Sequence, residues 1–305
     1  MPNALLYAVA TLIWGSTWLA ITLQYGVVPA SASVAYRFLL AGILMLAWCA
    51  WRRERLRLSG AELRWAALQG VLMFGVSYMM VYEAERHIAS GLMAVLNSSM
   101  VVINLVGARF AFGRRIDAKS ALGAGLGIAG IALVFWPELR GVNDASGWIG
   151  VGFGLGAALL ASLGNLVAQR NRDAALPLLP GIGYGMLVGG GTALLFTLLS
   201  GQPLVFDTRP SYLGSLFYLA VFGSVLAFAA YLTLLGRIGA ARSGYIAVAV
   251  PIAALLLSAW FEGFQWQLYT VAGIACAVVG NLIMLADVSG WLRRVGLDRL
   301  AARLA

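Results

Sequence analysis

The chain has 305 residues, of which 61% are hydrophobic and only 11% are charged, and its mean hydropathy is +0.87. This composition is far more apolar than that of an ordinary water-soluble domain, so a lipid bilayer is expected to be the main solvent of the side chains. The formal net charge of +9 does not indicate a nucleic-acid partner, because the arginines form short clusters between apolar segments, as they do in membrane proteins.

Uninterrupted apolar segments of about 20 residues follow one another along the chain, and this length crosses a hydrocarbon core of roughly 30 Å. The first is expected to be a retained helix, because no basic segment precedes it as in a cleaved signal peptide. The predicted fold class is therefore all-α, a polytopic membrane protein of ten transmembrane helices. The ten segments lie near residues 4–23, 31–51, 65–82, 89–111, 119–136, 147–168, 179–199, 212–235, 243–261 and 267–287.

Cations are distributed unevenly between the two sides of these segments. Seventeen Lys and Arg residues fall on the side of the two termini and three fall on the other side, while Arg37 lies within the second segment. Since cytoplasmic connections are enriched in Lys and Arg, both termini are predicted to be cytoplasmic in a multi-pass protein of the cell inner (plasma) membrane. Residues 289–305 mix apolar and basic side chains and are predicted to form an amphipathic cytoplasmic tail on the anionic leaflet.

An internal repeat appears at an offset of about 150 residues. Ser90-Gly91 aligns with Ser243-Gly244, and Gly123 and Gly130 align with a second glycine pair of the same spacing, Gly273 and Gly280. Small residues at these positions would let the fifth and tenth helices pack closely. Five helices is an odd number, so the second copy must be inverted in the membrane. The predicted organisation is a first five-helix repeat at 1–140, an inverted second repeat at 141–288 and the tail at 289–305.

Inverted repeats are a common architecture of secondary transporters, with the substrate site near the bilayer midplane. Four features of the sequence fit one such family: Trp14-Gly15-Ser16-Thr17 in the first helix, Tyr36-Arg37-Phe38 in the second, Pro251 in the ninth, and Glu262 after it. On these residues the chain resembles the ten-helix EamA-type transporters of the drug/metabolite transporter superfamily, and is similar to the amino-acid exporters of that group. It departs from the pattern where Ser98 replaces the first-repeat proline, and where Arg109 or Phe112 replaces a glutamate.

Several aromatic and polar side chains are predicted at depths where a transport cavity would lie. Pro251 cannot donate a hydrogen bond to the carbonyl of Ala247, which leaves an acceptor for a neighbouring side chain, water or substrate. Each candidate is also explained by ordinary helix packing, and Tyr82 by the aromatic belt at the interface. The candidate substrate-binding residues are Trp14, Trp18, Tyr78, Tyr82, Asn97, Ser98, Asn165, Tyr231 and Tyr245.

Arg37 lies farther inside a predicted span than any other cation of the chain. An arginine at this depth extends to the outer surface or finds a carboxylate, so pairing with Glu83 or Glu262 is one interpretation. The other is that Arg37 holds the carboxylate of a substrate.

The motifs that are missing from the sequence exclude several classes of protein. Lys119 is the only lysine and no Gly-x-x-x-x-Gly-Lys segment occurs, so nucleotide hydrolysis is not expected. His87 is the only histidine and is expected in an outer connection, which excludes a His-Glu-x-x-His metal site and makes a buried Ser/His pair hard to build, and no cofactor is expected. No carboxylate lies in the middle of a predicted span, so transport is not expected to require a proton gradient.

The function predicted from these observations is a secondary transporter, without enzymatic activity, that exports small amphipathic metabolites by alternating access. Neutral or aromatic amino acids are the substrate class implied by the resemblance. The alternative is a multidrug or nucleotide-sugar transporter of the same superfamily, and the distant alternative is an intramembrane enzyme. The expected partners are a small-molecule substrate and the lipid bilayer, with no nucleic acid, and the expected state is a monomer or a weak dimer.

Overall fold

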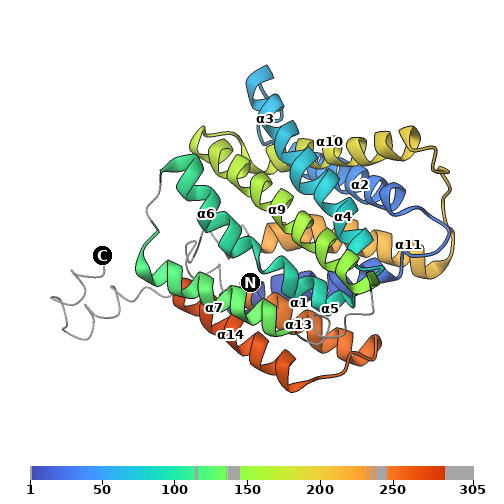
Figure 1. The fold of residues 1–305 in the computed structure, drawn as a ribbon. Helices are drawn as coiled ribbons and strands as arrows, with labels where there is room; N and C mark the ends of the chain where they lie inside the picture. The colour runs from blue at the N-terminus through green and yellow to red at the C-terminus, as the bar shows by residue number, and fades with distance from the viewer. Residues whose placement is uncertain are drawn as a thin grey trace.

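A computed structural model describes residues 2–113, 116–134, 136, 145–231, 233–234, 237 and 246–285. Its regular elements are all helical (Figure 1). Seven helices are long and apolar enough to cross a membrane, namely Asn3–Thr22, Ala30–Trp51, Gly60–Ala84, Ser90–Phe112, Ser146–Asp173, Leu178–Leu199 and Pro210–Tyr231. Three shorter apolar helices complete the ten predicted segments, at Ala118–Val134, Ala249–Phe261 and Leu268–Ile283. The ten-helix prediction is confirmed.

Seven of these spans are single helices. They are α1 (Asn3–Thr22), α2 (Ala30–Trp51), α7 (Ala118–Val134), α9 (Ala145–Asp173), α10 (Leu178–Leu199), α13 (Ile246–Phe261) and α14 (Leu268–Leu285). The predicted end of the sixth segment at residue 168 was wrong, because α9 continues to Asp173. Asn171 in this extension is buried and donates to Gln69 Oε1 at 3.0 Å, and this contact holds the extra turn against the third span.

The third, fourth and eighth spans are each composed of more than one element. The third comprises α3 (Gly60–Gly70), the π-helix η1 (Val71–Val76) and α4 (Ser77–Ala84). The eighth comprises α11 (Pro210–Phe217) and the π-helix η2 (Tyr218–Leu226). The third and eighth spans are equivalent in the predicted repeat, and both are widened near their middle. π-Helical turns occur frequently at functional sites. The fourth span comprises α5 (Ser90–Asn97) and α6 (Met100–Phe112).

The fifth and tenth spans, α7 and α14, lie side by side and pack through glycines (Figure 1). A Cβ added to Gly130 would lie 2.5 Å from the Gly273 carbonyl oxygen, and one added to Gly280 would lie 2.5 Å from the Gly123 carbonyl oxygen. The repeat alignment pairs Gly123 with Gly273 and Gly130 with Gly280. The contact between Gly123 and Gly280 is therefore equivalent to the contact between Gly273 and Gly130. One interface thus contains both copies of the same contact, which is what a two-fold axis between inverted halves produces.

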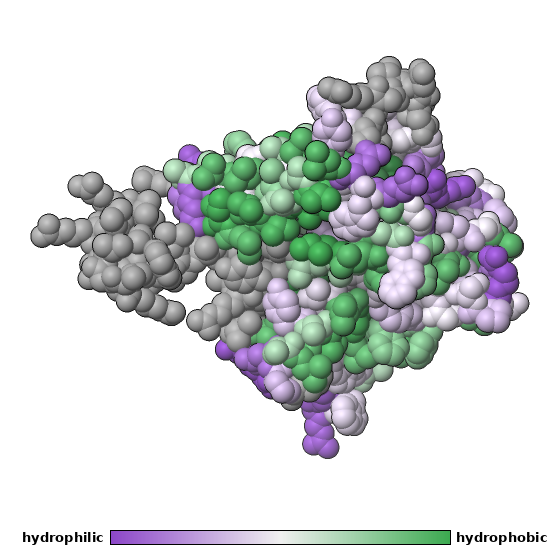
Figure 2. Space-filling model, turned by 90° about the horizontal axis from the view of Figure 1, so that it is seen from below, coloured by the Kyte–Doolittle hydropathy of each residue, from purple (hydrophilic) through white to green (hydrophobic). Residues whose placement is uncertain are grey.

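The surface carries large apolar side chains that a water-soluble protein would bury. Leu12, Phe110, Leu199 and Trp260 are all exposed. Figure 2 shows hydrophobic side chains over a broad area of one face, with hydrophilic groups gathered toward its margins. This pattern fits a protein whose outer surface faces lipid between two polar edges.

Candidate functional site

The fourth span is interrupted and the ninth carries a proline at the equivalent position of the repeat. In the fourth, the N–H groups of Ser98 and Ser99 donate to carbonyls three residues earlier, each at 3.0 Å, and this tighter turn separates α5 from α6. In the ninth, Pro251 lies inside α13. Ser98 and Pro251 line one small cavity together with Asn281, and its volume of about 10 Å³ is that of a single water. The structure therefore brings the two irregular positions of the inverted halves together.

Trp14 belongs to an aromatic group formed by the first and eighth spans. Its ring centroid lies 5.4 Å from that of Phe228 and 5.3 Å from that of Tyr231. Its indole Nε1 donates to the Gly223 carbonyl in η2 at 3.1 Å, and Ser16 Oγ lies 2.6 Å from the Tyr218 hydroxyl. The Trp-Gly-Ser-Thr segment of α1 is thus the part of the first span that binds the π-helical turn of the eighth.

Arg37 lies in the interior of the helix bundle and does not extend to the surface. Only 2% of the residue is exposed, and its Nε and Nη1 have no hydrogen-bond partner among the described residues. The guanidinium carbon lies 4.7 Å from the ring centroid of Tyr78 and 5.0 Å from that of Phe38. A buried guanidinium over two aromatic faces is stabilised by cation–π attraction, and it retains donors for an anionic group.

The predicted pairing of Arg37 with Glu83 or Glu262 does not occur in the structure. Glu83 instead contacts Arg86 at 3.3 Å and His87 at 3.6 Å. Glu262 accepts from Ser90 Oγ at 2.6 Å. Glu83 lies in the last turn of α4 and Glu262 directly follows α13, and each has a partner other than the guanidinium.

The remaining predicted site residues are distributed around the same core. Tyr82 is fully buried and donates to Gln24 Oε1 at 2.7 Å, so its hydroxyl serves an interior contact and not the interface belt. Trp18 packs against the main core, and its buried Nε1 has no partner among the described residues. Asn97 and Asn165 are half-buried. Tyr245 lies outside the described residues.

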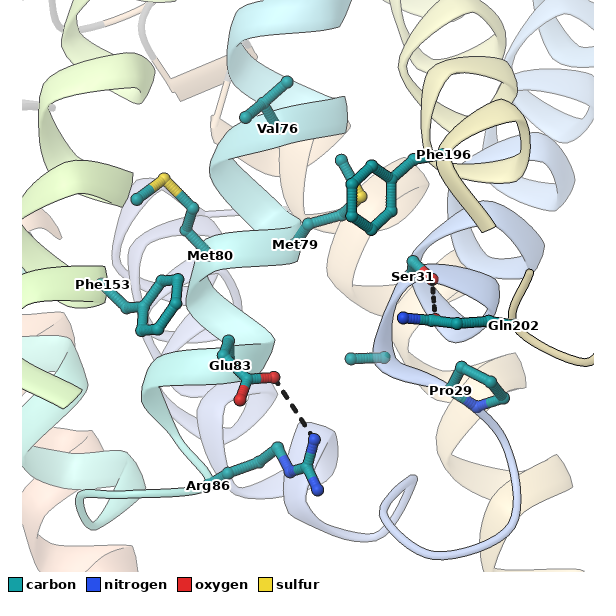
Figure 3. Close-up of a pocket in the computed structure, with 11 residues that line it drawn as sticks. Pro29, Ser31, Val76, Met79, Met80, Glu83, Arg86, Phe153, Phe196 and Gln202 are labelled. Atoms are coloured by element: carbon teal, nitrogen blue, oxygen red, sulfur yellow. Dashed lines mark hydrogen bonds and ion pairs between the residues drawn. The ribbon is translucent and has the colours of Figure 1, made fainter. Parts of the chain in front are cut away.

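A larger cavity, of about 530 Å³, lies between α2, α4, α9 and α10 (Figure 3). None of the predicted substrate-binding residues lines it. It is lined by Val76, Met79 and Met80 of the third span, whereas Tyr78 and Tyr82 lie on a different side of this span and do not line it. Methionine and phenylalanine walls with polar groups at one end suit an amphipathic molecule. The lining residues are Pro29, Ala30, Ser31, Val76, Met79, Met80, Glu83, Arg86, Phe153, Phe196 and Gln202.

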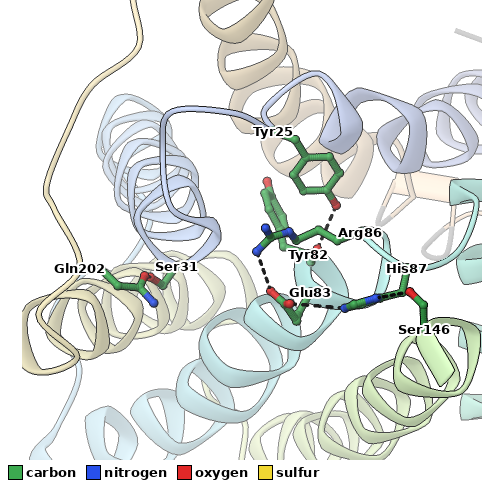
Figure 4. Close-up of polar contacts among 8 residues, drawn as sticks. All are labelled: Tyr25, Ser31, Tyr82, Glu83, Arg86, His87, Ser146 and Gln202. Atoms are coloured by element: carbon green, nitrogen blue, oxygen red, sulfur yellow. Dashed lines mark hydrogen bonds and ion pairs between the residues drawn. The ribbon is translucent and has the colours of Figure 1, made fainter.

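Polar side chains gather at the end of the bundle that holds the connections 23–29, 85–89, 200–209 and 262–267, which is the predicted outer end. Figure 4 shows some of these contacts. The Tyr25 hydroxyl donates to the Tyr82 carbonyl at 2.9 Å, and His87 Nδ1 lies 2.8 Å from Ser146 Oγ. Ser31 Oγ donates to Gln202 Oε1 at 2.8 Å. These contacts join four of the spans at this end.

Glu85 is a functional candidate that sequence reasoning missed. It directly follows α4, where a carboxylate normally reaches water, but it is only 6% exposed. Both carboxylate oxygens lack a hydrogen-bond partner among the described residues. Burial and the nearby charge of Glu262 raise the pKa of the Glu85 carboxyl well above its ordinary value, against the opposing charge of Arg37. The sequence signal was weak, because Glu85 stands between two other charged residues of a short connection, Glu83 and Arg86.

In the part of the chain that the structure describes, no group of three or more His, Cys, Asp or Glu side chains is arranged to hold a metal ion. The arrangement instead combines interrupted helices, a buried cation and aromatic rings inside a membrane-spanning bundle. This is the chemistry of binding and releasing a solute.

The fold and the interrupted spans define a polytopic helical membrane protein built from two halves related by inversion. Two copies of the EamA-like transporter family model match residues 1–136 and 148–286, so the chain belongs to the EamA-like transporter family. It is a transporter and not an enzyme.

Individual relatives match over most of their length. The inner membrane transporter YedA of Escherichia coli is 29% identical over 291 residues, which cover 92% of this chain and 89% of the relative. Protein PagO of Salmonella typhimurium is 21% identical over 285 residues, covering 92% of each chain. A solved crystal structure of a protein superposes with a TM-score of 0.68 at 18% identity, over 96% of this chain and 98% of the other. This likeness extends to the whole ten-helix fold.

Proposed function

We propose that this transporter exports small amphipathic metabolites across the inner membrane, with neutral and aromatic amino acids as the substrate class, by alternating access of its two repeats. The observation that carries the proposal is the environment of Arg37. Its unpartnered Nε and Nη1 are suited to a substrate carboxylate, while Tyr78 and Phe38 supply aromatic surface beside it. An amino acid with an apolar side chain combines these two requirements.

Alternating access is supported by the unequal packing of the fourth span. In α5, every residue from Ser90 to Leu96 is buried. In α6, no residue from Met100 to Phe112 is buried, although a lipid-facing helix normally buries one side against its neighbours. The bundle is therefore closed around α5 at the predicted outer end and loosely packed around α6 at the predicted inner end. Transport requires a second state in which this difference is reversed.

At the closed end, the two repeats are in direct contact. A Cβ added to Gly91 would lie 2.9 Å from the Leu255 Cα and 2.8 Å from the Ser258 Cβ, so α5 and α13 touch almost backbone to backbone. Ser90 donates to the Glu262 carboxylate in the same region. Opening this end requires the fourth and ninth spans to separate there.

The proposal includes the arrangement of the chain in the membrane. Both termini are cytoplasmic, the repeats occupy 1–140 and 141–288, and 289–305 is a cytoplasmic tail that lies outside the described residues. The relative YedA is an inner membrane transporter, which supports the same location here. The protein functions as a monomer or a weak dimer.

Multidrug and nucleotide-sugar transport are the competing functions. A lipophilic cation would have to approach the buried guanidinium of Arg37, which repels it. A nucleotide sugar carries two phosphates, and Arg37 is the only buried cation among the described residues. Both substrates therefore fit this environment less well than a single carboxylate.

Counterflow into proteoliposomes tests the substrate class. Vesicles loaded with unlabelled L-phenylalanine should accumulate labelled L-phenylalanine from outside, and tetraphenylphosphonium or a nucleotide sugar should not exchange. Tyr78→Ala should slow the exchange, whereas Met79→Ala is the matched control, because Met79 lies on the same helix but lines the larger cavity. If only Met79→Ala has an effect, the substrate uses the cavity beside Met79. Exchange of tetraphenylphosphonium or the nucleotide sugar without L-phenylalanine would refute the proposed substrate class.

A further inference from the structure

Buried polar atoms without partners are concentrated near the predicted outer end of the first three spans. The donors among them are Gln24 Nε2, Trp18 Nε1, and Nε and Nη1 of Arg37. The acceptors are the two oxygens of Glu85. Each such group would be costly if it were truly unsatisfied, so a concentration of them marks a place where a proton, water or solute is bound.

Tyr82 connects the members of this group. Its hydroxyl donates to Gln24, and the charge of Arg37 acts on the same hydroxyl. The charge of Arg37 also acts on Glu85, although no ion pair joins the two side chains. The structure thus holds a buried cation and a buried carboxyl group near one another but not in contact.

The groups that face Glu85 come from four elements. Arg37 approaches from α2, Tyr25 from the connection between α1 and α2, and Glu262 from the connection between α13 and α14. On its own connection, Glu83 contacts Arg86 and His87. The Tyr25 hydroxyl lowers the pKa of Glu85 and so opposes the rise caused by burial. The hydrogen bond of the Tyr25 hydroxyl, however, is donated to the Tyr82 carbonyl. Glu85 therefore lies near one buried cation, Arg37, and one further carboxylate, Glu262.

The two carboxyl groups are not equally solvated. Glu262 accepts two hydrogen bonds from Ser90, from its N–H at 3.4 Å and from its hydroxyl at 2.6 Å. Glu85 has no such donor and is almost completely removed from water. A carboxyl group that is removed from water and accepts no hydrogen bond is stable in its neutral form unless a cation pairs with it. Of the two carboxyl groups, Glu85 is therefore the one suited to hold a proton.

We propose that Glu85 is the proton-binding site that couples proton movement to transport, which replaces the proton-independent transport expected from the sequence. In the state with the outer end closed, an O–H bond on the Glu85 carboxyl keeps the group neutral and leaves the Arg37 donors free for a substrate carboxylate. When the outer end opens, the proton leaves to water and the resulting carboxylate can pair with Arg37, which displaces the substrate anion. This inference rests on the proposed role of Arg37 in holding that anion.

The direction of the pKa shift of Glu85 is consistent with this arrangement. Its pKa is raised by burial and by the charge of Glu262. Between the ordinary pKa of a glutamate and the raised value, the folded protein holds a proton that the unfolded chain has lost. Stability is therefore expected to fall as pH rises through this interval, and the substitution Glu85→Gln should remove that dependence.

Infrared difference spectroscopy of the full-length protein in lipid tests the proton directly and needs no substrate. The wild type should show the C=O stretch of a protonated carboxyl at neutral pH, and the band should disappear on titration to alkaline pH. It should be absent from Glu85→Gln, which replaces the neutral acid by a neutral amide of similar shape. Glu83→Gln is the matched control, because Glu83 is partly exposed and paired, and this variant should retain the band. A wild type without the band at neutral pH, or a band that persists in Glu85→Gln, overturns the proposal.

A second measurement separates this inference from the proposed substrate class. Proteoliposomes containing a pH-sensitive dye should show a pH change inside when an L-phenylalanine gradient is imposed, and Glu85→Gln should lose that change. L-Phenylalanine movement with equal pH changes in both proteins refutes the coupling. If L-phenylalanine does not move at all, the substrate class is wrong, and the infrared result alone decides whether Glu85 binds the proton.

Discussion

Replacing Gly130 by alanine should destabilise the bundle by separating α7 from α14. The added Cβ would lie 2.5 Å from the Gly273 carbonyl oxygen and 2.6 Å from the Ala277 backbone nitrogen, and both are backbone atoms that cannot rotate away. An ordinary contact needs roughly 3.4 Å, so the helices must move apart by about 1 Å, a gap that loses a quarter to a half of each dispersion contact beside it. We expect a loss of about 1–3 kcal/mol, the usual range for overpacking.

Gly125 is the matched control on the same helix, because a Cβ added there meets nothing within 4 Å. Gly125→Ala should be neutral or stabilise by up to about 1 kcal/mol, because alanine loses less backbone entropy in a helix. Gly280→Ala should resemble Gly130→Ala, because it reproduces the same contact in the other repeat. The apparent unfolding temperature of the purified variants in detergent measures these differences. Equal stability of Gly130→Ala and Gly125→Ala would refute both the close packing and the symmetric interface.

Three further predictions concern the site and the topology. Tyr78→Ala and Asn97→Ala should each reduce L-phenylalanine exchange several-fold while the yield of folded protein, measured by size-exclusion chromatography, stays unchanged. Above pH 4.5, the ordinary pKa of the Glu85 carboxyl, wild-type stability should fall by up to about 1.4 kcal/mol per pH unit relative to Glu85→Gln, measured by unfolding across a pH series. In a variant without the native cysteines, an impermeant thiol reagent should label Gln265→Cys but not Gly60→Cys in intact cells. The reverse labelling would contradict the cytoplasmic termini.

The number of spans followed directly from the sequence, because each crossing needs about 20 apolar residues whatever its neighbours are. The close approach of α7 and α14 was also predictable, since glycines seven residues apart lie on one helix face and recur in both repeats. The joint cavity of Ser98 and Pro251 agrees with their equivalence in the alignment. In these cases local spacing or internal repetition carries the information.

The environment of the candidate site was much harder to predict. The sequence placed Arg37 within the second span, but its expected partners were chosen from carboxylates near the same membrane depth. Glu83 and Glu262 point to other partners, and the carboxyl group that faces the guanidinium region belongs to Glu85. A shift of two residues along a helix turns a side chain by about 200°, so depth alone does not identify neighbours.

The sequence by itself determined the membrane class, the ten spans, the repeat and the glycine interface, because these depend on segment length, composition and spacing. Only the tertiary structure decided that Arg37 is buried without an ion pair, that Glu85 is removed from water at a helix end, and that Tyr78 and Met79 face different spaces. The physical reason is that lipid accepts apolar side chains on every helix face. The hydrophobic pattern that would reveal the buried side of a helix in a soluble protein is weak here, and the rotation of each helix is set by its packing against the others.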